Sequence, residues 1–339
     1  MTTISKRIAA AMAAFLTTAS FAQAQEVTLR IAHPYADNHY LSEHGIKIWA
    51  EDVMRRTDGA VAFEYFPAGQ LGKAQVSLLE TGLADISFLV PSQEVDKMPL
   101  SSVLELPGYI QSACAGADRF NAIARPGGEL DRQELAPLGV RLLYTNMLPP
   151  YVIMTKANPV RSPEDMVGLK LRANGVAIGE TMRGLEAVPL PISSAEIFES
   201  ISRGTIDGAF FPWAAITPYS LEEEIRYITQ GVSLGGAASL VSISEESWQG
   251  LSPEIQTAML KASEVAQENL CTWLDDNVAA TRAKMTGDFG IELIDLSPED
   301  AAAWYEKVAG VADNWVARMG TLGLDGAAVI AAFDAAGGT

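Results

Sequence analysis

The sequence predicts an α/β protein of two similar lobes, each with a mostly parallel sheet covered by helices. Strand-like and helix-like runs alternate from residue 27 onward, a rhythm typical of parallel strands joined by helices. One order of features also occurs twice, in residues 79–91 and 201–212: a helix closed by Gly, then an Asp, then a buried strand that ends at Pro. The length of 339 residues fits two domains of roughly 150 residues each.

In the first half, strands are expected where apolar and aromatic residues alternate or run together, and helices where apolar residues recur every three or four positions. The expected strands are 27–33, 60–67 and 84–91, and the expected helices are 39–57 and 73–82. In the second half the expected strands are 139–144, 169–173 and 208–212, and helices begin at the capping residues Ser162 and Ser193. Both lobes would direct the carboxyl ends of their strands at a shared crevice, where open α/β sheets bind ligands.

The last third is predicted to be helical. A helix begins at Ser252 and runs past Asp276, with an amphipathic pattern that suits packing across both lobes. Another helix begins at Ser297. The predicted organisation is a first lobe of residues 25–145 plus 238–279 and a second lobe of residues 146–237 plus 280–335. The hinge strands are expected near residues 144–146 and 234–238.

Residues 1–24 are typical of a secretory signal peptide. Lys6 and Arg7 precede an apolar run over residues 8–21, and Ala22-Gln23-Ala24 is a cleavage site. We therefore expect export to the bacterial periplasm. With 24 basic and 42 acidic residues, the net charge of −18 argues against a nucleic-acid partner, which would require a basic face.

The sequence gives only weak signals for catalysis or metal binding. The three histidines are His33, His39 and His44; His39 and Glu43 have the spacing of a metal pair, but no HExxH accompanies them. The letters of a nucleophile elbow, G-x-S-x-G, occur once, at residues 231–235, but they run into the expected hinge strand and not into a predicted helix; P-loop and dinucleotide motifs are lacking. We therefore expect no metal, no cofactor and binding rather than catalysis. Cys114 and Cys271 are interpreted as two unpaired, buried small residues, although an oxidising compartment would permit a bridge.

Arg172 is the strongest candidate for contact with a ligand. In the strand 169–173 it shares a face with Lys170, opposite Leu169 and Leu171. This face brings a guanidinium to the carboxyl end of the strand, where its fork of donors can hold a carboxylate through two hydrogen bonds. On spacing alone, a solvated arginine on an outer strand is an equal alternative.

Several separated motifs resemble a known family. They are FPAGQLG at 66–72, LPGY at 106–109, SPEDMVGLKLR at 162–172, VPLPISSAEIFESISRGTIDG at 188–208 and SWQGLSPEIQ at 247–256. In order and over nearly the whole chain, they resemble the solute-binding proteins of TRAP transporters (the DctP type). The resemblance implies a two-lobed, periplasmic-binding-protein-like fold with a long C-terminal helix bridging the lobes. It implies a monomeric receptor, not an enzyme, that delivers an organic acid to the small and large subunits of an ion-gradient-driven permease. The arginine that pairs with the substrate carboxylate in that family falls on Arg172.

The sequence also departs from the family pattern. Phe211 stands where members that bind acidic sugars or dicarboxylates usually have Asn, and a second arginine near residues 151–153 is missing. Buried hydroxyls without partners would cost ~1–3 kcal/mol each, so a monocarboxylate with an apolar or aromatic body is expected. The candidate ligand-binding residues are Arg172, Phe211, Trp213, Asn146, Tyr151, Pro91, Val90, His33 and Tyr35.

Three points stay open. Phe210 and Phe211 alternate along a strand, so one is expected in the core and the other, Phe211, at the cleft. Because the net charge is negative, attraction of an anion requires a local field from Arg172, with Lys170 or His33 as further sources. The alternative functions are a C4-dicarboxylate or sugar-acid receptor of the same system, a receptor for another permease or a sensor, and a periplasmic enzyme acting on a small carboxylic acid.

Overall fold

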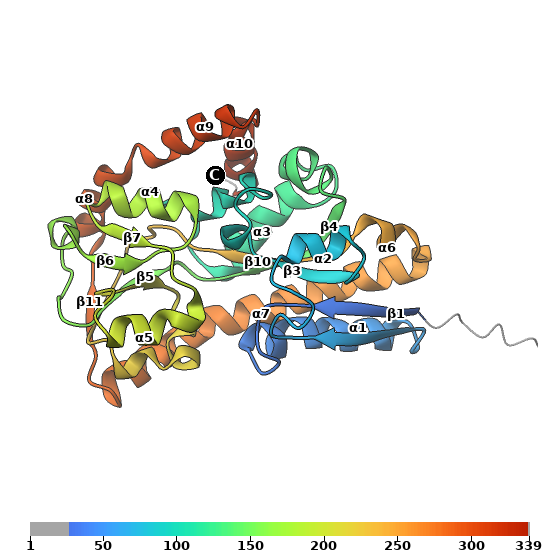
Figure 1. The fold of residues 1–339 in the computed structure, drawn as a ribbon, viewed down its shortest axis with the longest axis horizontal. Coiled ribbons are helices and arrows are strands. Elements are labelled where there is room, and N and C mark those ends of the chain that lie inside the picture. Colours follow the sequence, from blue (N-terminus) through green and yellow to red (C-terminus); the bar gives the residue numbers. More distant parts are fainter. Residues whose placement is uncertain (1–26, 338–339) are drawn as a thin grey trace, which may run out of the picture.

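Two β-sheets with their covering helices form two lobes, seen side by side in Figure 1. The computed structural model describes residues 27–337. The predicted signal peptide, residues 1–24, lies outside these described residues. None of the helices within residues 27–337 is long and apolar enough to cross a membrane.

The first lobe contains a five-stranded sheet in the order β2-β1-β3-β10-β4. Its strands are β1 (Val27–Ala32), β2 (Val61–Phe66), β3 (Ile86–Leu89), β4 (Val140–Met147) and β10 (Ala238–Ser244). β1 is parallel to β2 and β3, whereas β10 is antiparallel to β3 and β4. Around this sheet lie α1 (Lys47–Arg56), α2 (Gln75–Glu80), α3 (Ala113–Ala124) and α6 (Glu245–Gln249).

The second lobe contains a six-stranded sheet in the order β11-β9-β5-β8-β6-β7. Its strands are β5 (Val152–Thr155), β6 (Lys170–Arg172), β7 (Val188–Leu190), β8 (Gly208–Phe211), β9 (Tyr227–Gln230) and β11 (Glu292–Asp295). β6 is parallel to β7 and β8, and β5 is antiparallel to β8 and β9. The helices that follow β6 and β7 are α4 (Val176–Gly184) and α5 (Ile197–Ser202). β5 is the first strand after the chain passes into the second lobe, and β10 is the first strand after it returns to the first lobe. Both strands are antiparallel to their neighbours.

The chain crosses between the sheets through residues 148–151 and 231–237, a third time along the long helix that follows β10, and it returns once more through the helices after β11. The first two crossings are hydrogen bonded to each other: Leu148 N–H donates to Ala237 O at 3.0 Å, and Tyr151 N–H donates to Gly235 O at 3.1 Å. α7 (Pro253–Gly287) extends along both lobes (Figure 1). Its predicted start is confirmed, because Ser252 Oγ accepts the N–H of Ile255.

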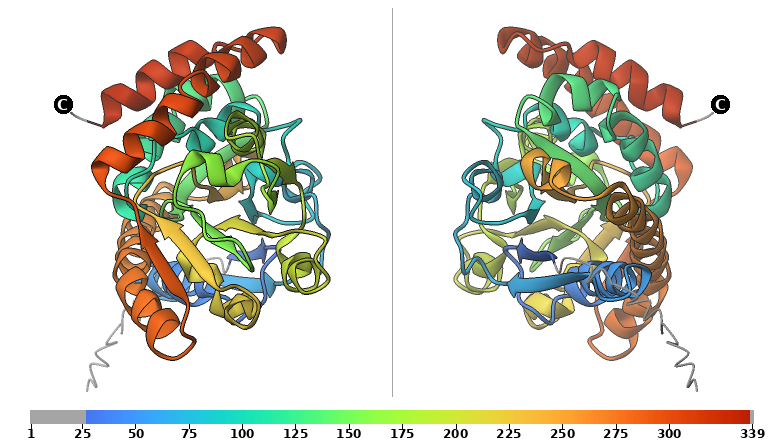
Figure 2. Two further views of the ribbon diagram at one scale, coloured as in Figure 1. Left: turned by 90° about the vertical axis from the view of Figure 1, so that its left-hand side faces the viewer. Right: turned by 90° about the vertical axis from the view of Figure 1, so that its right-hand side faces the viewer.

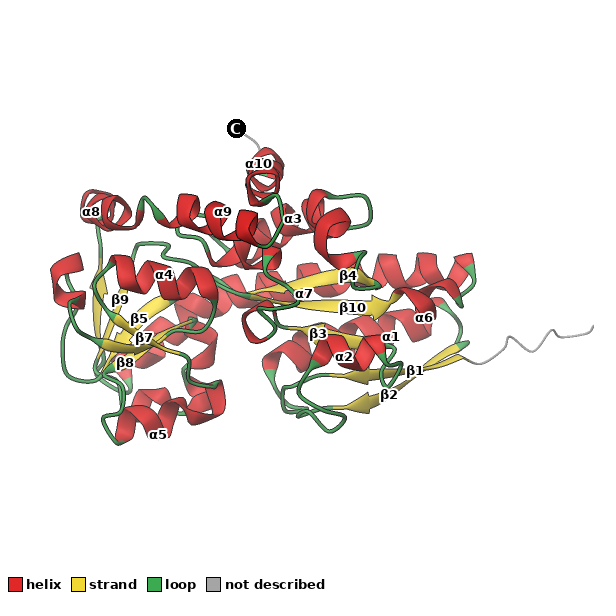
Figure 3. Cartoon of the chain, turned by 45° about the horizontal axis from the view of Figure 1, so that its top comes forward, coloured by secondary structure: helices red, strands yellow, loops and turns green. Residues whose placement is uncertain are grey.

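After β11, three helices return from the second lobe to the first. They are α8 (Pro298–Val308), α9 (Val311–Thr321) and α10 (Gly326–Ala336). α9 packs against α4, and α10 packs against α3, so this segment contacts elements of both lobes (Figure 3). In the end-on views of Figure 2, α10 (red) lies on the opposite side of the molecule from α1 (blue).

The expectation of unpaired cysteines was wrong. Cys114 at the start of α3 and Cys271 in α7 form a disulfide, with their Cα atoms 4.8 Å apart. This separation lies in the usual range for disulfides, and it depends on how α3 and α7 cross. Asp275 of α7 strengthens the same contact by accepting the N–H groups of Ala113 and Cys114 at 2.8 and 3.2 Å. Within residues 27–337, the one His/Cys/Asp/Glu group close enough to hold a metal contains these two bonded cysteines.

Candidate ligand-binding site

The two sheets place strand ends of both lobes around one space. In the second lobe, Arg172 is the last residue of β6 and lies beside Ala209 of β8 in the parallel register. Phe211, the last residue of β8, lies beside Val152, the first residue of β5. Side chains two positions apart on a strand share a face, so Arg172 and Phe211 meet at the edge that faces the first lobe.

Arg172 is buried, with 5% of its surface exposed. Its Nε donates to the backbone oxygen of Ile192 at 3.1 Å, and its Nη2 donates to Ser194 Oγ at 3.4 Å. The guanidinium carbon lies 4.3 Å from the centroid of the Phe211 ring, a cation–π geometry. No ion pair among residues 27–337 includes Arg172. Since a guanidinium has further N–H donors, the group retains both charge and hydrogen-bonding capacity for an anion.

Tyrosine side chains surround this cation. Burial lowers the pKa of Arg172, and the nearby hydroxyls of Tyr151 and Tyr219 act in the opposite direction. Burial raises the pKa of Tyr151 to about 12, with the charge of Arg172 opposing that rise. The ring of Phe211 lies 6.0 Å from that of Tyr151 and 5.7 Å from that of Tyr219, measured between centroids. Arg172 is therefore a charged group in an aromatic surrounding that contains neutral hydroxyls.

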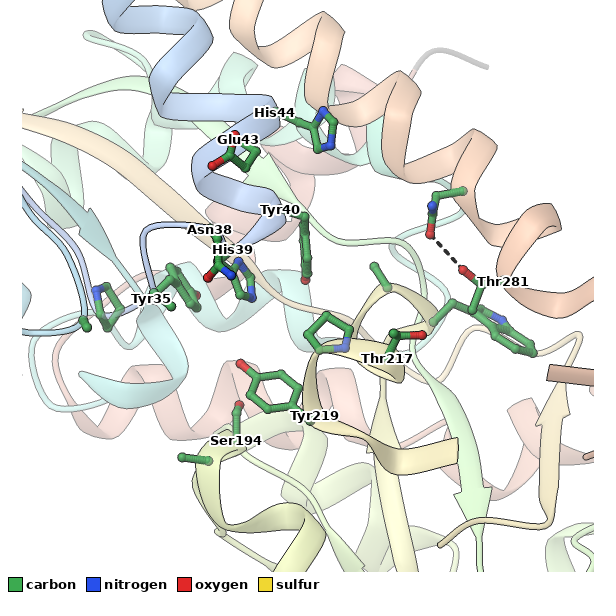
Figure 4. A pocket seen from close by; sticks show the side chains of 18 of the residues that line it. Tyr35, Asn38, His39, Tyr40, Glu43, His44, Ser194, Thr217, Tyr219 and Thr281 are labelled. Carbon is green, nitrogen blue, oxygen red and sulfur yellow. Dashed lines mark hydrogen bonds between the residues drawn. The ribbon is translucent and has the colours of Figure 1, made fainter. Parts of the chain in front are cut away.

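A cavity of about 940 Å³ opens between the lobes beside this cluster (Figure 4). The loop after β1 contributes Tyr35, Asn38, His39 and Tyr40, the second lobe contributes Ser194, Trp213, Thr217 and Tyr219, and α7 contributes Trp273, Asn277, Thr281 and Lys284. Tyr219 and Ser194 lie across from Tyr35 in Figure 4. Arg172 does not line this cavity itself, so an anion entering from it would reach the guanidinium past Ser194 and Tyr219.

Two expectations about the local field need correction. Burial lowers the pKa of His33 to about 4, so this imidazole is neutral at pH 7 and adds no positive charge. Lys170 is exposed at the start of β6, one strand length from the cluster. Because neither His33 nor Lys170 adds positive charge to the aromatic cluster, Arg172 is its source of positive charge. Lys73 and Lys284 are the lysines that line the cavity.

The other sequence-predicted residues occupy three kinds of position. Tyr35 and Trp213 line the cavity, and Tyr151 packs beside Arg172. His33 and Asn146 are buried inside the first lobe: His33 stacks on Phe88 at 5.0 Å, and Asn146 Nδ2 donates to Ser239 Oγ at 3.3 Å. Val90 and Pro91 are buried where β3 ends. These last four residues do not line the cavity.

Both members of the aromatic pair are buried, and Phe211 does not line the cavity, so its place at the cleft stays a prediction. Phe210 is fully buried, whereas Phe211 faces Arg172. Sequence reasoning missed Tyr219 and Ser194, which lie close to Arg172. Ser194 is the first residue after the predicted helix cap Ser193, and Tyr219 ends the short 3₁₀ segment Thr217–Tyr219 that follows β8. Neither position carries a sequence signal for contact with Arg172.

The family described as "Bacterial extracellular solute-binding protein, family 7" (DctP) matches residues 31–318. The chain belongs to this family. Among family 7 relatives, a solute-binding protein of Roseobacter denitrificans is 28% identical over 260 residues, covering 76% of this chain and 78% of the relative. The C4-dicarboxylate-binding periplasmic protein DctP of Rhodobacter capsulatus is 26% identical over 309 residues, covering 88% and 89%.

Solved structures of family 7 proteins share the fold. A TRAP solute-binding protein from a marine metagenome, specific for aromatic acid ligands, has a TM-score of 0.83 at 22% identity, covering 92% of this chain and 98% of its own. One from Bordetella bronchiseptica, with bound (R)- and (S)-mandelate, has a TM-score of 0.75 at 25% identity, covering 92% and 98%. One from Roseobacter denitrificans, with bound L-galactonate, has a TM-score of 0.71 at 24% identity, covering 88% and 97%.

These matches confirm the expected fold class and the resemblance to TRAP solute-binding proteins. This chain is a TRAP solute-binding protein, and proteins of its family are periplasmic. Proteins of this kind bind small organic acids and work with a membrane permease. The family is one of transport receptors rather than of enzymes.

Proposed function

We propose that this protein captures an organic monocarboxylate with an apolar or aromatic body and delivers it to a TRAP permease. The observation that carries the proposal is the buried Arg172 guanidinium, which rests on the ring of Phe211 and forms no ion pair within residues 27–337. A carboxylate would accept two parallel hydrogen bonds from the guanidinium fork. Binding would also relieve the unfavourable burial of an unpaired cation.

The residues around Arg172 favour an apolar ligand body. Phe211, Tyr151 and Tyr219 place aromatic surface beside the guanidinium. An aromatic ring buried against them gains about 25 cal/mol for each Å² removed from water. A sugar acid would bring several hydroxyls to the same surface, and each one left without a partner costs ~1–3 kcal/mol. The bound mandelate of the Bordetella bronchiseptica relative supports an aromatic acid.

A dicarboxylate or sugar acid is the second candidate. Lys73 and Lys284 line the cavity, and either ammonium could pair with a second carboxylate of a longer ligand. The relatives named for C4-dicarboxylate and with bound L-galactonate fit this alternative. The panel of ligands described below separates the two candidates.

In this proposal the ligand is held by closure of two lobes, residues 25–145 plus 238–279 and residues 146–237 plus 280–335. Tyr35 of the first lobe lies close enough to Arg172 of the second to affect the pKa of the guanidinium. A ligand that contacts both would stabilise the closed arrangement, since it shifts an equilibrium only through differential contacts. The crossings at 148–151 and 231–237 would act as the hinge.

The test is calorimetric titration of the mature protein, residues 25–339, after unfolding and refolding to remove any bound acid. The panel contains benzoate, phenylacetate and mandelate, compared with succinate, malate, galacturonate and galactonate. We expect the aromatic acids to bind at least about tenfold more tightly, a difference of about 1.4 kcal/mol. Tighter binding of any dicarboxylate or sugar acid would contradict the aromatic assignment. NMR of the recovered ligand after long incubation checks that the receptor returns it unchanged.

A further inference from the structure

We call the proposed pairing of Arg172 with a ligand carboxylate the anion clamp. Glu105 is a buried acid that takes no direct part in it. It ends the 3₁₀ segment Leu100–Glu105 and is only 2% exposed. Its Oε2 accepts the N–H of Ala177 in the first turn of α4 at 3.1 Å. The N–H groups of Val176 and Ile178 also face this carboxyl group. No ion pair within residues 27–337 includes Glu105, so the helix start is its principal partner.

This contact joins segments that are far apart in the sequence. Residues 100–105 are fixed at their other end by Glu134, whose carboxylate accepts the N–H of Ser101 at 3.0 Å. Glu134 lies just before β4 of the first lobe, whereas α4 follows β6 of the second lobe. The carboxyl group of Glu105 therefore holds a helix of the second lobe to a segment that is anchored in the first.

The contact also lies close to Arg172 along the chain. Only Ala173 and Asn174 separate Arg172 from Gly175, the residue that precedes α4. A Cβ at Gly175 would collide with the carboxyl group of Glu105, so the close approach depends on glycine there. Gly175 has φ +108°, a backbone conformation that also favours glycine.

A second chain of contacts leads from Glu105 to the same arginine. A Cβ at Gly235 would collide with the backbone oxygen of Glu105, so these two backbones are in close contact. Gly235 O accepts the N–H of Tyr151 in the other crossing segment. Arg172 and Glu105 both lie close enough to Tyr151 to affect the pKa of its hydroxyl. Glu105 is thus connected to Arg172 through the start of α4 and through the crossing segments.

We propose that Glu105 is a positioning residue of the anion clamp. By fixing the start of α4 and segment 173–175, Glu105 holds Arg172 in place to bind a carboxylate. The inference rests on the proposed function of Arg172. Burial raises the pKa of Glu105 to about 8, against the effect of the helix N–H groups, which fits a group that is enclosed by these contacts.

The test compares Glu105→Ala and Glu105→Gln with the matched control Glu94→Ala. Glu94 also accepts an N–H at the start of a helix, that of Val76 at 3.0 Å, but this contact lies within the first lobe. One readout is the NMR resonance of Arg172 Nε–H in ligand-free protein, which reports its hydrogen bond to Ile192. The other is the Kd of benzoate from calorimetry, with thermal unfolding measured to confirm that each variant is folded.

We expect Glu105→Ala to shift or broaden the Arg172 Nε–H resonance and to raise the Kd at least about tenfold. Glu105→Gln should keep both the Arg172 Nε–H resonance and the Kd of benzoate closer to wild type, because its amide oxygen still accepts an N–H. Glu94→Ala should change neither. An unchanged resonance and an unchanged Kd in folded Glu105→Ala would overturn the inference, as would equal effects from Glu94→Ala. If wild type binds none of the acids, the proposed function fails, and the resonance still decides the positioning role.

Discussion

Replacement of Arg172 by Met tests the anion clamp most directly. Methionine keeps apolar bulk against Phe211 but removes the charge and all the donors. Two charge-assisted hydrogen bonds are each worth about 1.5–3 kcal/mol, so their loss costs about 3–6 kcal/mol. At about 1.4 kcal/mol per factor of ten, the Kd of the best acid should rise by roughly 10²- to 10⁴-fold.

The ligand-free protein should respond differently. Arg172→Met loses the hydrogen bonds to Ile192 O and Ser194 Oγ and the contact with Phe211, together a few kcal/mol at most. It also removes a buried cation without an ion-pair partner among the described residues, whose desolvation is unfavourable. These effects oppose each other, so the melting temperature should change by only a few degrees.

The assay is calorimetric titration at pH 7 together with differential scanning calorimetry of ligand-free protein. Arg172→Lys should bind with intermediate affinity, because a lysine retains the charge but not the fork. Lys170→Met is the matched control, since it removes an exposed cation from the same strand, and its Kd should stay within about twofold of wild type. An affinity of Arg172→Met within threefold of wild type would refute the clamp, and so would an equal loss in Lys170→Met.

Three further predictions concern specificity, pH and the disulfide. Phe211→Asn should weaken benzoate binding by at least about tenfold, because the aromatic contact is lost, and titration with galacturonate should show a gain relative to benzoate; an unchanged preference would count against the aromatic body. Burial raises the pKa of Glu105 to about 8 and of Glu134 to about 7, above their ordinary 4.5. The folded state therefore binds these protons more tightly than the unfolded state, which makes the unfolding free energy fall as pH rises from about 4.5 to 8, while His33 and His39, whose pKa burial lowers to about 4, oppose this fall below about pH 6.5. Calorimetry between pH 5 and 8 should show a smaller slope for Glu105→Gln, whereas an identical slope would exclude Glu105 as its source. Replacing Cys114 and Cys271 together by Ser should lower the unfolding free energy by about 2–5 kcal/mol, measured by urea titration, with ligand affinity unchanged; equal stability would show that the bridge adds nothing to the contact of α3 with α7.

Several features of the fold could be predicted because they depend on neighbours in the chain. The alternation of strands and helices follows from apolar spacing, and Ser252 before a proline marks the start of α7. The period of two along β6 and β8 separates the face of Arg172 from that of Leu171 and the face of Phe211 from that of Phe210. Each of these inferences uses residues only a few positions apart.

The antiparallel strands were not predicted. β5 and β10 run against their neighbours because each begins where the chain enters a lobe from the other. Apolar pattern is the same for a strand in either direction, so the pattern cannot reveal its orientation. The resemblance to a two-lobed family implied the crossings, but their hydrogen bonds to each other appear only in the folded chain.

By itself, the sequence determined the lobes, the long helix and the strand end that carries Arg172, since local periodicity and capping encode them. Only the tertiary structure decided what surrounds Arg172: Tyr219 and Ser194 lie in short 3₁₀ segments whose local pattern does not record their contact with this arginine. It also decided that Cys114 pairs with Cys271 and that His33 is neutral. Pairing and pKa depend on distances and burial between segments far apart in the chain, and these are fixed by how helices and sheets pack, which local spacing does not record.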